Sequence, residues 1–450
     1  MTSSTTMPLP PASPGQHSGW APEEHLAGPA ETRYPGGMPR LLPPGGPAPA
    51  GLRAHLARFG APPLDHPRQR FVAEVEAAGL TGRGGAAFPT YRKLAAMARN
   101  RRPAVVIGNG AEGEPASSKD KTLLWASPHL VLDGLQLAAG AIGSATAGLY
   151  VHHDRRLHQW LSAAIAERAA AGLDLVPVEL IGAPHRFLAG EESALASRAA
   201  GGPALPRFKP PRASERGVAD HPTLVQNVET LAHLALIARY GAAWFRSAGT
   251  AGEPGSMLAT LHQADGQVAV VETEPGTPIA ALLRLPAQAV LVGGYHGAWI
   301  PGDLAERLPL ANAALRPLGA AVGAGVLAAL PADRCGLAET ARVARYLALE
   351  SAGQCGPCFN GLPRIAGALA ELAGPRPSPG TLADIRRWSG LADGRGACRH
   401  PDGTVRFVRS ALGVFAAELD GHTRGQCSGT SGRPFLPLPP DLALDEADWR

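Results

Sequence analysis

The sequence has few lysines and lacks long uninterrupted apolar runs. Only four of its 42 basic residues are lysine, and these are Lys93, Lys119, Lys121 and Lys209. Each lysine therefore stands out against an arginine background. A net charge of +4 over 450 residues gives no reason to expect a nucleic-acid partner. No stretch of about 18 apolar residues without charges occurs, and no early run resembles a signal peptide. We therefore expect a cytoplasmic protein without direct membrane insertion.

Cysteine is also scarce, and its placement is uneven. All five cysteines lie in the last third of the chain: Cys335, Cys355, Cys358, Cys398 and Cys427. An odd number with one close pair, and without a secretion signal, argues against a disulfide framework. We therefore expect the cysteines of this region to ligate a metal or a cluster rather than to form disulfides.

Glycine and proline are abundant, at 55 and 44 residues, and they punctuate the chain. The length suits two or three domains. Residues 1–50, rich in proline and glycine, are predicted to be a disordered leader, and residues 428–450 a loose tail. Strand and helix patterns alternate over 51–250, which predicts an α/β domain. Short strands dominate 255–325 and predict a small α+β domain, and helices dominate 330–427.

The sharpest local pattern is the glycine-rich stretch from Gly79 to Thr90. Closely spaced glycines allow backbone N–H groups to approach an anion. A helix is expected directly afterwards, and its positive end favours phosphate. Arg83 and Lys93 could add charge. An ordinary flexible turn is the alternative, and the stretch is not a dinucleotide fingerprint because G-x-G-x-x-G is absent.

Three polar segments follow later elements of the same domain. They begin at Asn109, Phe187 and Pro222, and they carry acidic pairs and amides. Ligands of open α/β sheets bind at the carboxyl edge of the strands, where such groups converge. Amides and carboxylates there can hydrogen-bond the hydroxyls and ring edge of a flavin. Each acidic pair alone is more often a solvated loop.

Together these segments resemble the NADH-binding flavoprotein subunit of respiratory complex I and related diaphorase subunits. The family's GRGGAGFPTGxKW reads GRGGAAFPTYRKL here, and its NADESEPGTxKDR reads NGAEGEPASSKDK. GEETAL reads GEESAL, VNNVETL reads VQNVETL, and RxKPP is present as RFKPP. The order and spacing agree over roughly residues 60–425. Five ordered motifs are far more specific than any one of them.

The resemblance implies a fold and a chemistry. It implies a Rossmann-like FMN-binding domain, a β-grasp domain of the soluble-ligand-binding type, and a C-terminal helical bundle with an iron–sulfur segment. It also implies that NADH reduces FMN and that electrons leave singly through a cluster. The catalytic candidates are Lys93, Glu112 and Glu114. The implied cofactor-binding residues are Gly82, Arg83, Gly84, Gly85, Phe88, Lys93, Asn109, Glu112, Gly190, Glu191, Glu192 and Asn227.

The chain departs from the family's pattern at several of these positions. Ala111 stands where the family has an aspartate, and Phe187 stands where it has a tyrosine before the GEE run. Gln226 replaces the first asparagine of the family's VNN. Two aromatics expected to stack on adenine correspond to Ala96 and Arg212. Arginine can stack on adenine but alanine cannot. The sequence therefore supports FMN more strongly than any one electron donor, and the candidate donors are NADH, NADPH and another carrier.

The cysteine segment from Glu350 to Gly361 resembles the family's ESCGxCxPCxxG. Thiolates spaced C-x-x-C-x-x-C, with a distant fourth cysteine, can hold a [4Fe–4S] cluster. Here Cys355, Cys358 and Cys398 match, but the first position is Ala352. Three cysteines could hold a [3Fe–4S] cluster or a [4Fe–4S] cluster with another ligand on one iron. Alternatively, Cys335 or His400 completes the set, or the cluster is lost; a zinc site or a redox pair is the simplest interpretation of one C-x-x-C alone.

The leading functional hypothesis is an NADH dehydrogenase-like oxidoreductase subunit. It would pass electrons from FMN through the cluster to a ferredoxin or to another oxidoreductase subunit, in the cytoplasm or at the periphery of a membrane complex. The alternative is a non-catalytic electron-relay or assembly module that kept the fold and lost NADH oxidation. Ala96, Ala111 and Ala352 favour this alternative. The bleaching of bound flavin by NADH separates the two hypotheses.

Overall fold

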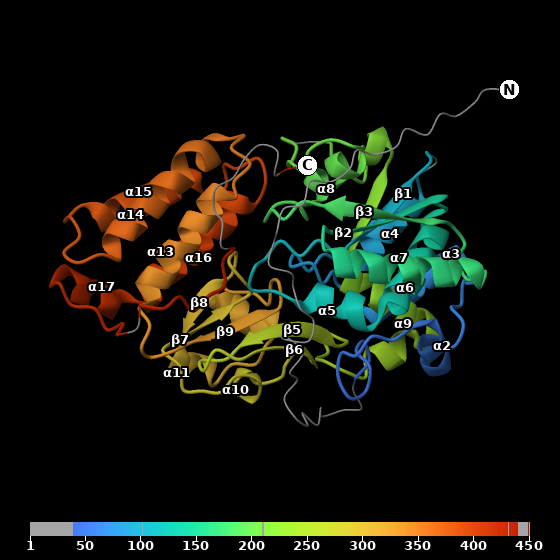
Figure 1. The fold of residues 1–450 in the computed structure, drawn as a ribbon, viewed down its shortest axis with the longest axis horizontal. Coiled ribbons are helices and arrows are strands. Elements are labelled where there is room, and N and C mark those ends of the chain that lie inside the picture. The colour runs from blue at the N-terminus through green and yellow to red at the C-terminus, as the bar shows by residue number, and fades with distance from the viewer. Residues whose placement is uncertain (1–38, 101, 209–210, 431, 440–448, 450) are drawn as a thin grey trace.

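The chain folds into two sheets and a group of helices (Figure 1). This computed structural model describes residues 39–100, 102–208, 211–430, 432–439 and 449. In the view of Figure 1 the parallel sheet and its helices lie on the right, a mixed sheet lies below, and the orange and red C-terminal helices lie on the left. We call these parts the parallel-sheet unit (51–245), the mixed-sheet unit (257–330) and the helical unit (336–423).

Four parallel strands form the first sheet, and they are β1 (Val105–Asn109), β2 (Thr146–His152), β3 (Val178–Ala183) and β4 (Thr223–Asn227). Their order is β3-β2-β1-β4, so β1 is central and its end at Asn109 lies beside the end of β4 at Asn227. Successive residues of β1 alternate between two cores, with Val106 in the larger and Ile107 in the smaller. Both faces of the sheet are therefore covered, as is usual for parallel sheets.

Helices pack on both sides of this sheet and complete the parallel-sheet unit. The largest contact joins the two most apolar helices, α6 and α9 (Pro128–Ile142 and Val228–Phe245), whose residues are mostly buried. Gly134 allows this close approach, because a Cβ there would lie 1.8 Å from the carbonyl oxygen of Leu231. The remaining helices are α2 (Leu52–Phe59), α3 (Arg68–Ala78), α4 (Thr90–Ala98), α5 (Lys119–Ala126), α7 (Arg155–Ala170), α8 (Glu192–Ala199) and the short η1 (Val218–Asp220).

The mixed-sheet unit contains five strands, and they are β5 (Met257–His262), β6 (Val268–Thr273), β7 (Ala289–Val292), β8 (Ala298–Pro301) and β9 (Val326–Leu330). Their order is β6-β5-β9-β7-β8, with β5 and β9 parallel and the other pairs antiparallel. The sheet thus reaches Leu330, beyond the expected 255–325. Short helices fill the connections: α10 (Ile279–Leu282), α11 (Gly302–Ala305), α12 (Asn312–Leu315) and η2 (Arg316–Leu318).

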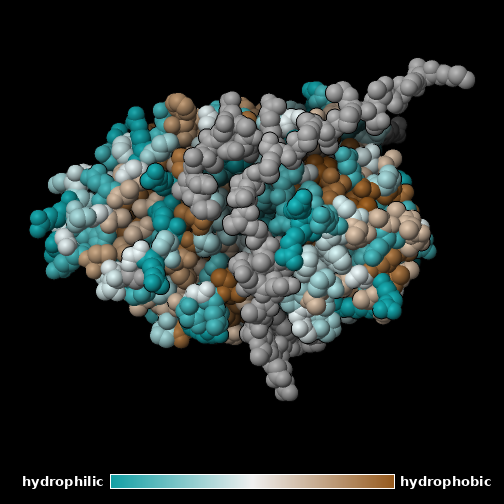
Figure 2. Space-filling model, in the orientation of Figure 1, coloured by the Kyte–Doolittle hydropathy of each residue, from teal (hydrophilic) through white to brown (hydrophobic). Residues whose placement is uncertain are grey.

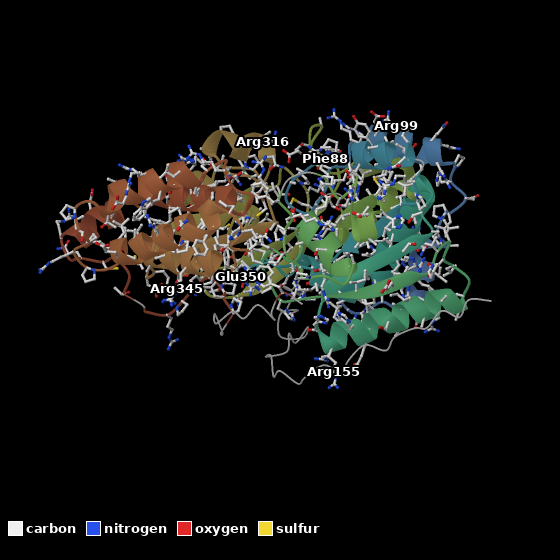
Figure 3. The ribbon with its side chains drawn as sticks, turned by 90° about the horizontal axis from the view of Figure 1, so that it is seen from above. Phe88, Arg99, Arg155, Arg316, Arg345 and Glu350 are labelled. Atoms are coloured by element: carbon white, nitrogen blue, oxygen red, sulfur yellow. The ribbon has the colours of Figure 1, made fainter. Side chains whose placement is uncertain are left out.

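The helical unit comprises α13 (Gly336–Leu349), the π-helical η3 (Pro357–Gly361), α14 (Leu362–Leu372), α15 (Thr381–Ala392), α16 (His400–Val414) and α17 (Ala416–Thr423). Glu350, at the end of α13, lies at the junction with the parallel-sheet unit (Figure 3). Its carboxylate accepts hydrogen bonds from Arg186 Nε at 3.0 Å and from the Phe187 N–H at 2.8 Å. This buried pair holds the helical unit against the loop that precedes α8.

The prediction of a disordered leader over 1–50 is wrong for its described part, residues 39–50; residues 1–38 lie outside the described chain. The backbone N–H groups of Arg40, Leu41 and Leu42 donate to the buried Glu272 carboxylate at 2.9–3.1 Å. Leu41 is fully buried in the main core. The proline- and glycine-rich composition gave no sign that this segment is ordered, because two leucines and one distant carboxylate are enough to anchor it.

The prediction of a loose tail is likewise wrong where the structure describes it. Leu436 is buried, and its N–H donates to Glu339 on α13 at 3.0 Å. The Tyr295 hydroxyl donates to the Pro437 carbonyl, and Arg186 stacks on the Trp449 ring with 3.9 Å between the guanidinium carbon and the ring centroid. The described residues of the tail therefore pack against all three units.

Teal and brown residues are interspersed on the described surface in the view of Figure 2. Within the described residues, no helix combines the length and apolar character that crossing a membrane requires.

Candidate functional site

The glycine-rich loop connects α3 to α4 and is closed by backbone hydrogen bonds. The Gly82 N–H donates to the Phe88 carbonyl at 2.8 Å, and the Thr90 N–H donates to the Leu80 carbonyl at 3.0 Å. Gly84 and Gly85 are exposed at the tip. Gly85 has φ +98°, a conformation that side chains with a Cβ rarely adopt. The loop therefore presents bare backbone to solvent at the start of α4.

This loop lies over the end of β4 and the start of α9. A Cβ on Gly84 would be 3.4 Å from the Asn227 Cβ, so the two backbones approach closely. The Arg83 N–H donates to the Thr230 hydroxyl at 2.9 Å. Arg83 Nε is buried, lies 4.0 Å from a Glu229 oxygen, and makes no hydrogen bond among the described residues. The loop is thus fixed on the carboxyl edge of the sheet with an unsatisfied cationic donor.

The end of β1 meets the loop before α8 at the same edge. Asn109 Nδ2 donates to the Gly190 carbonyl at 2.9 Å, and the Ala111 N–H donates to Asn109 Oδ1 at 3.1 Å. A Cβ on Gly190 would lie 2.7 Å from the Ala111 carbonyl oxygen, so only glycine fits without a shift. Asn227 Nδ2 is 3.5 Å from the Asn109 carbonyl. Three segments far apart in sequence therefore converge, as their positions at strand ends predict.

The acidic residues of these segments cap helices. Glu112 is buried and accepts from the N–H groups of Asp120 and Lys121 at the start of α5, both at 3.2 Å. Burial and the nearby Asp120 raise the pKa of Glu112. Glu191 is the N-cap of α8 and accepts from the Ser193 N–H at 2.9 Å. These carboxylates fix the loops around the site, a role that helix starts favour.

Lys93 and Phe88 are the more accessible members of the predicted set. Lys93 Nζ lies 3.5 Å from Glu192 Oε1 and 3.4 Å from the Val225 carbonyl, so α4, α8 and β4 meet around this ammonium. Phe88 is 43% exposed. Figure 3 places it at the surface of the parallel-sheet unit. An exposed phenyl ring beside a glycine loop is free to stack on a planar ligand.

A buried ion cluster next to this edge was not predicted from the sequence. Lys119 Nζ lies 2.7 Å from Asp120 Oδ1 and 2.8 Å from Glu229 Oε2, and all three side chains are buried. Asn227 Nδ2 donates to the second Asp120 oxygen at 2.7 Å. The cluster thereby orients an amide of the predicted site. The scarcity of lysine was the signal that pointed to Lys119.

An open cavity lies between the glycine loop and the mixed-sheet unit. Its empty volume, which includes space open to solvent, is about 390 Å³, and its walls include Gly82, Arg83, Gly85, Lys119, Glu229 and Gly323. The lining combines bare glycine backbone with Arg83 and Lys119, and Glu229 in the same wall offsets part of their charge.

Glu114 lies outside this cavity wall and faces the mixed-sheet unit. Its carboxylate accepts from the Tyr295 N–H at 2.7 Å and from the Ala116 N–H at 3.2 Å. Gly294 makes room for it, because a Cβ there would lie 2.5 Å from Glu114 Oε2. Burial raises the pKa of Glu114 to about 7, against the lowering effect of the two N–H donors.

This raised pKa predicts a pH dependence of stability. The ordinary value is 4.5, so the fold favours the protonated carboxyl. That contribution is complete below pH 4.5 and is lost as the pH rises through about 7, by about 3 kcal/mol in all. In Glu114→Gln, which stays neutral, we expect the free energy of unfolding relative to wild type to rise between pH 5.5 and 8.5. Urea titrations at the two pH values test this, and a pH-independent difference would contradict it.

The three matched cysteines also converge. Cys358 is buried in the π-helical turn and lies close enough to Cys355 for a side-chain hydrogen bond. Burial, then Cys355 and Cys398, raise the pKa of its thiol. Burial also raises the pKa of Cys398, and the nearby Glu191 carboxylate adds to that effect. Cys398 thus lies within electrostatic range of Glu191, and Phe187 of the same loop packs on His400 with ring centroids 5.6 Å apart.

His400 and Cys335, the two candidate replacements for the missing fourth cysteine, are not placed to ligate the cluster. His400 is buried, with Nε2 at 2.7 Å from the Leu347 carbonyl and Nδ1 at 3.0 Å from His296 Nε2, so both ring nitrogens are engaged. Cys335 lies beside Cys427, at the other end of α13 from the cysteine segment. The hydroxyl of Ser351, by contrast, hydrogen-bonds Cys358. Ala352 itself offers no ligating atom.

The fold and these adjacent sites define a flavin- and iron–sulfur-binding component of an oxidoreductase. The family model described as the Nuo51 FMN-binding domain matches residues 75–236. The model of the NADH-ubiquinone oxidoreductase-F iron-sulfur binding region matches residues 338–422. The resemblance inferred from the motifs is thereby confirmed for both halves of the site.

Individual relatives agree with this class. The NADH-quinone oxidoreductase F subunit of Streptomyces coelicolor is 30% identical over 392 residues, which cover 81% of this chain and 84% of that protein. The F 2 subunit of the same enzyme in Rhizobium meliloti is 29% identical over 394 residues, covering 83% and 92%. A crystal structure of an NAD⁺-reducing [NiFe]-hydrogenase matches with a TM-score of 0.73 at 28% identity, over 86% of this chain and 68% of that one. The chain belongs to the family of NADH-quinone oxidoreductase F subunits.

The residues present fit both cofactors of this family. Bare glycine backbone, the unsatisfied Arg83 Nε and Lys93 provide donors for a phosphate, and Asn109 and Asn227 provide amides at the sheet edge. For the cluster, three thiols converge in a segment that adjoins the flavin side. Three sulfur donors fit a cluster with three cysteine ligands, and they do not fit the family's four-cysteine set.

Proposed function

We propose that the chain oxidises NADH at FMN and passes the electrons through an iron–sulfur cluster to a partner protein. The observation that carries this proposal is the proximity of the two candidate sites: Phe187, in the loop before α8, packs on His400 at the start of α16 with ring centroids 5.6 Å apart. When bound, FMN accepts a hydride from NADH and releases electrons one at a time. One chain would thus hold, at neighbouring positions, the flavin that takes two electrons from NADH and the cluster that accepts them one at a time.

The chain's own residues bind and orient the reactants in this proposal. The loop around Gly84 and Gly85 would hold the FMN phosphate, with Lys93 and Arg83 supplying charge. Asn109 and Asn227 would hydrogen-bond the ribityl chain and ring edge, because they lie at the ends of the adjacent strands β1 and β4. The exposed Phe88 would stack on the nucleotide.

The acidic residues would act mainly by position. Glu112 holds the segment after β1 against the start of α5, and Glu191 caps α8. Glu192, at the start of the same helix, contacts Lys93. Glu114, with its pKa near neutrality, is suited to exchange a proton at working pH. These roles account for the acidic pairs without requiring each carboxylate to touch FMN.

The remaining structural and cellular assignments follow from the same proposal. The parallel-sheet unit would be the Rossmann-like FMN domain, the mixed-sheet unit a β-grasp domain and the helical unit the cluster-binding domain. The partner would be a ferredoxin or another oxidoreductase subunit, since a cluster needs an outlet. The strand order β6-β5-β9-β7-β8, with one parallel pair, supports the β-grasp assignment. We place the protein in the cytoplasm or at the periphery of a membrane complex.

Anaerobic reduction of the flavin tests this function. Purified protein reconstituted with FMN and iron–sulfide should lose its flavin absorption on addition of NADH, and a slower change should follow in the cluster absorption. A flavin that dithionite bleaches but neither NADH nor NADPH bleaches would support the alternative of a non-catalytic relay or assembly module.

Replacement of Ala352 tests how the cluster is held. Ala352→Cys should supply a fourth thiolate beside Cys355 and Cys358, because residue 352 is partly exposed and follows Ser351, which already contacts Cys358. We expect iron to rise from about three to about four atoms per chain. Leu391→Cys, an exposed position on α15, controls for a surplus thiol and should leave iron unchanged. Equal iron in Ala352→Cys and wild type would contradict a three-iron cluster held by three cysteines.

A further inference from the structure

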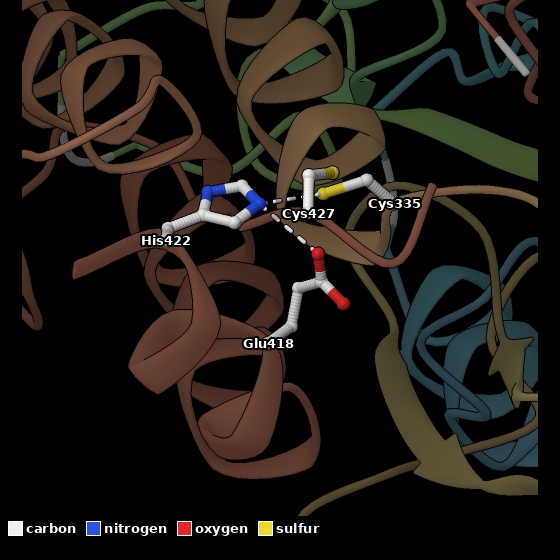
Figure 4. Close-up of side chains that lie close together, drawn as sticks. All are labelled: Cys335, Glu418, His422 and Cys427. Atoms are coloured by element: carbon white, nitrogen blue, oxygen red, sulfur yellow. Dashed lines mark hydrogen bonds and ion pairs between the residues drawn. The ribbon is translucent and has the colours of Figure 1, made fainter. Parts of the chain in front are cut away.

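A second group of metal-ligating side chains lies at the far end of α13 from the cysteine segment. It consists of Cys335, Glu418, His422 and Cys427, whose ligand atoms all lie within 4.8 Å of one another (Figure 4). Neither family motif accounts for it, and the sequence pattern gives Cys427 no role. We propose that these four residues form a tetrahedral zinc site.

The distances suit a tetrahedral ion. With Zn–N and Zn–S bonds of about 2.0 and 2.3 Å, a nitrogen and a sulfur on the same tetrahedral ion are about 3.5 Å apart. Cys335 Sγ and His422 Nε2 are separated by 3.6 Å. Glu418 Oε1 lies 3.0 Å from the same nitrogen, somewhat shorter than the tetrahedral edge, so a small shift of this side chain would accompany binding.

The imidazole is oriented as it is in metal sites. His422 Nδ1 lies 3.1 Å from the Leu372 carbonyl, which can only accept, so Nδ1 carries a proton. Nε2 therefore faces the Glu418 carboxylate and the Cys335 sulfur, and it is the nitrogen that would ligate an ion held between them. Carbonyl-bound Nδ1 is also the usual outer contact of a zinc-bound histidine.

Three separate segments supply the ligands. Glu418 and His422 are four residues apart on α17 and share one face of it. Cys427 follows in the turn after this helix, and Cys335 is the N-cap of α13, where its sulfur accepts from the Ala338 N–H at 3.3 Å. Ser428 holds Glu418 through its N–H at 3.0 Å. The site therefore closes the C-terminal helix and its following turn onto the start of α13.

The chemistry of the set favours zinc. Two thiolates, one imidazole and one carboxylate match the donor types of structural zinc sites, whereas magnesium and calcium prefer oxygen ligands. Cys335 and His422 are buried, and Cys427 is exposed and leaves an entry path. The ion would staple residues 427–430 over Cys335, where Gly429 already packs so closely that a Cβ would lie 2.7 Å from the Cys335 nitrogen.

Metal analysis of the full-length protein tests the site. Protein expressed with zinc and purified without chelator should contain about one zinc per chain by mass spectrometry, besides its iron. Cys427→Ser and His422→Gln should lower zinc at least tenfold and leave iron and flavin unchanged. Cys427 is exposed, so this variant is expected to fold. Cys355→Ser is the matched control and should lose iron while it keeps zinc.

Cobalt gives a readout that does not depend on electron transfer. Protein loaded with cobalt in place of zinc should show the visible absorption of a tetrahedral thiolate complex, absent in Cys427→Ser. Equal zinc in wild type and Cys427→Ser would overturn the proposal, as would a disulfide between Cys335 and Cys427 in protein prepared under reducing conditions. Neither result bears on the flavin and cluster function, because Cys355→Ser and NADH reduction report on that function separately.

Discussion

Replacing Cys358 with alanine should remove the iron–sulfur cluster and disconnect the flavin from its acceptor. Cys358 is the most buried of the three converging thiols, and its neighbours Cys355 and Cys398 cannot retain a cluster with two sulfur ligands. We expect iron to fall at least tenfold and NADH-driven reduction of a ferredoxin-type acceptor to fall by roughly 100-fold or more, equivalent to about 3 kcal/mol. Bleaching of FMN by NADH in a single turnover should change only a few-fold.

The matched control for this variant is Cys427→Ser, which removes a thiol outside the cluster and should keep both iron and acceptor reduction. A Cys358→Ala protein with wild-type iron would contradict the three-cysteine assignment. Loss of single-turnover flavin bleaching in a folded Cys358→Ala protein would show that the two sites are not separable as proposed.

The second large effect is expected at Gly85. Valine there would force a branched side chain into φ +98° and place it on the exposed loop that would hold the FMN phosphate. A Cβ at Gly85 has 3.7 Å to the nearest atom of Gly323, so the chain itself leaves room for it. We therefore expect folded protein with FMN affinity reduced about 100-fold, which corresponds to about 2.7 kcal/mol.

Gly172→Val is the control that separates loss of the phosphate-binding loop from the effect of backbone strain alone. Gly172 has φ +63°, no atom lies within 4 Å of a Cβ built on it, and it follows α7, outside the site. Both variants should lower the melting temperature, and only Gly85→Val should weaken FMN in fluorescence titrations. Equal FMN affinity in the two variants would contradict a phosphate-binding role of the loop.

Much of the fold was predictable because its apolar periodicity is strong. The alternation of strands and helices expected over 51–250 is present as the four parallel strands and the helices that cover them. The stretch Thr223–Asn227 was recognised as a polar motif, although its first four residues are buried between β1 and α9, which gave no alternation to detect.

The site was predictable only where backbone geometry determines it. Closely spaced glycines before a predicted helix indicated a phosphate loop, and the convergence of Asn109, Gly190 and Asn227 followed from the carboxyl-edge rule. The partners of the acidic side chains were not predictable, because Glu112 caps α5 and Glu114 meets the mixed-sheet unit through contacts that only the folded chain reveals. The same holds for Cys335 and His422, which are 87 residues apart in sequence and 3.6 Å apart in space.

The most direct test of the central claim is an anaerobic titration of the reconstituted protein with NADH, followed by absorption and electron paramagnetic resonance spectra. We expect NADH to bleach the flavin band and a reduced-cluster or altered cluster signal then to appear, with the cluster signal absent in Cys358→Ala. A flavin that remains oxidised with NADH and NADPH while dithionite reduces it, or a flavin that bleaches without any change at the cluster, would contradict the proposed path from NADH through FMN to iron–sulfur.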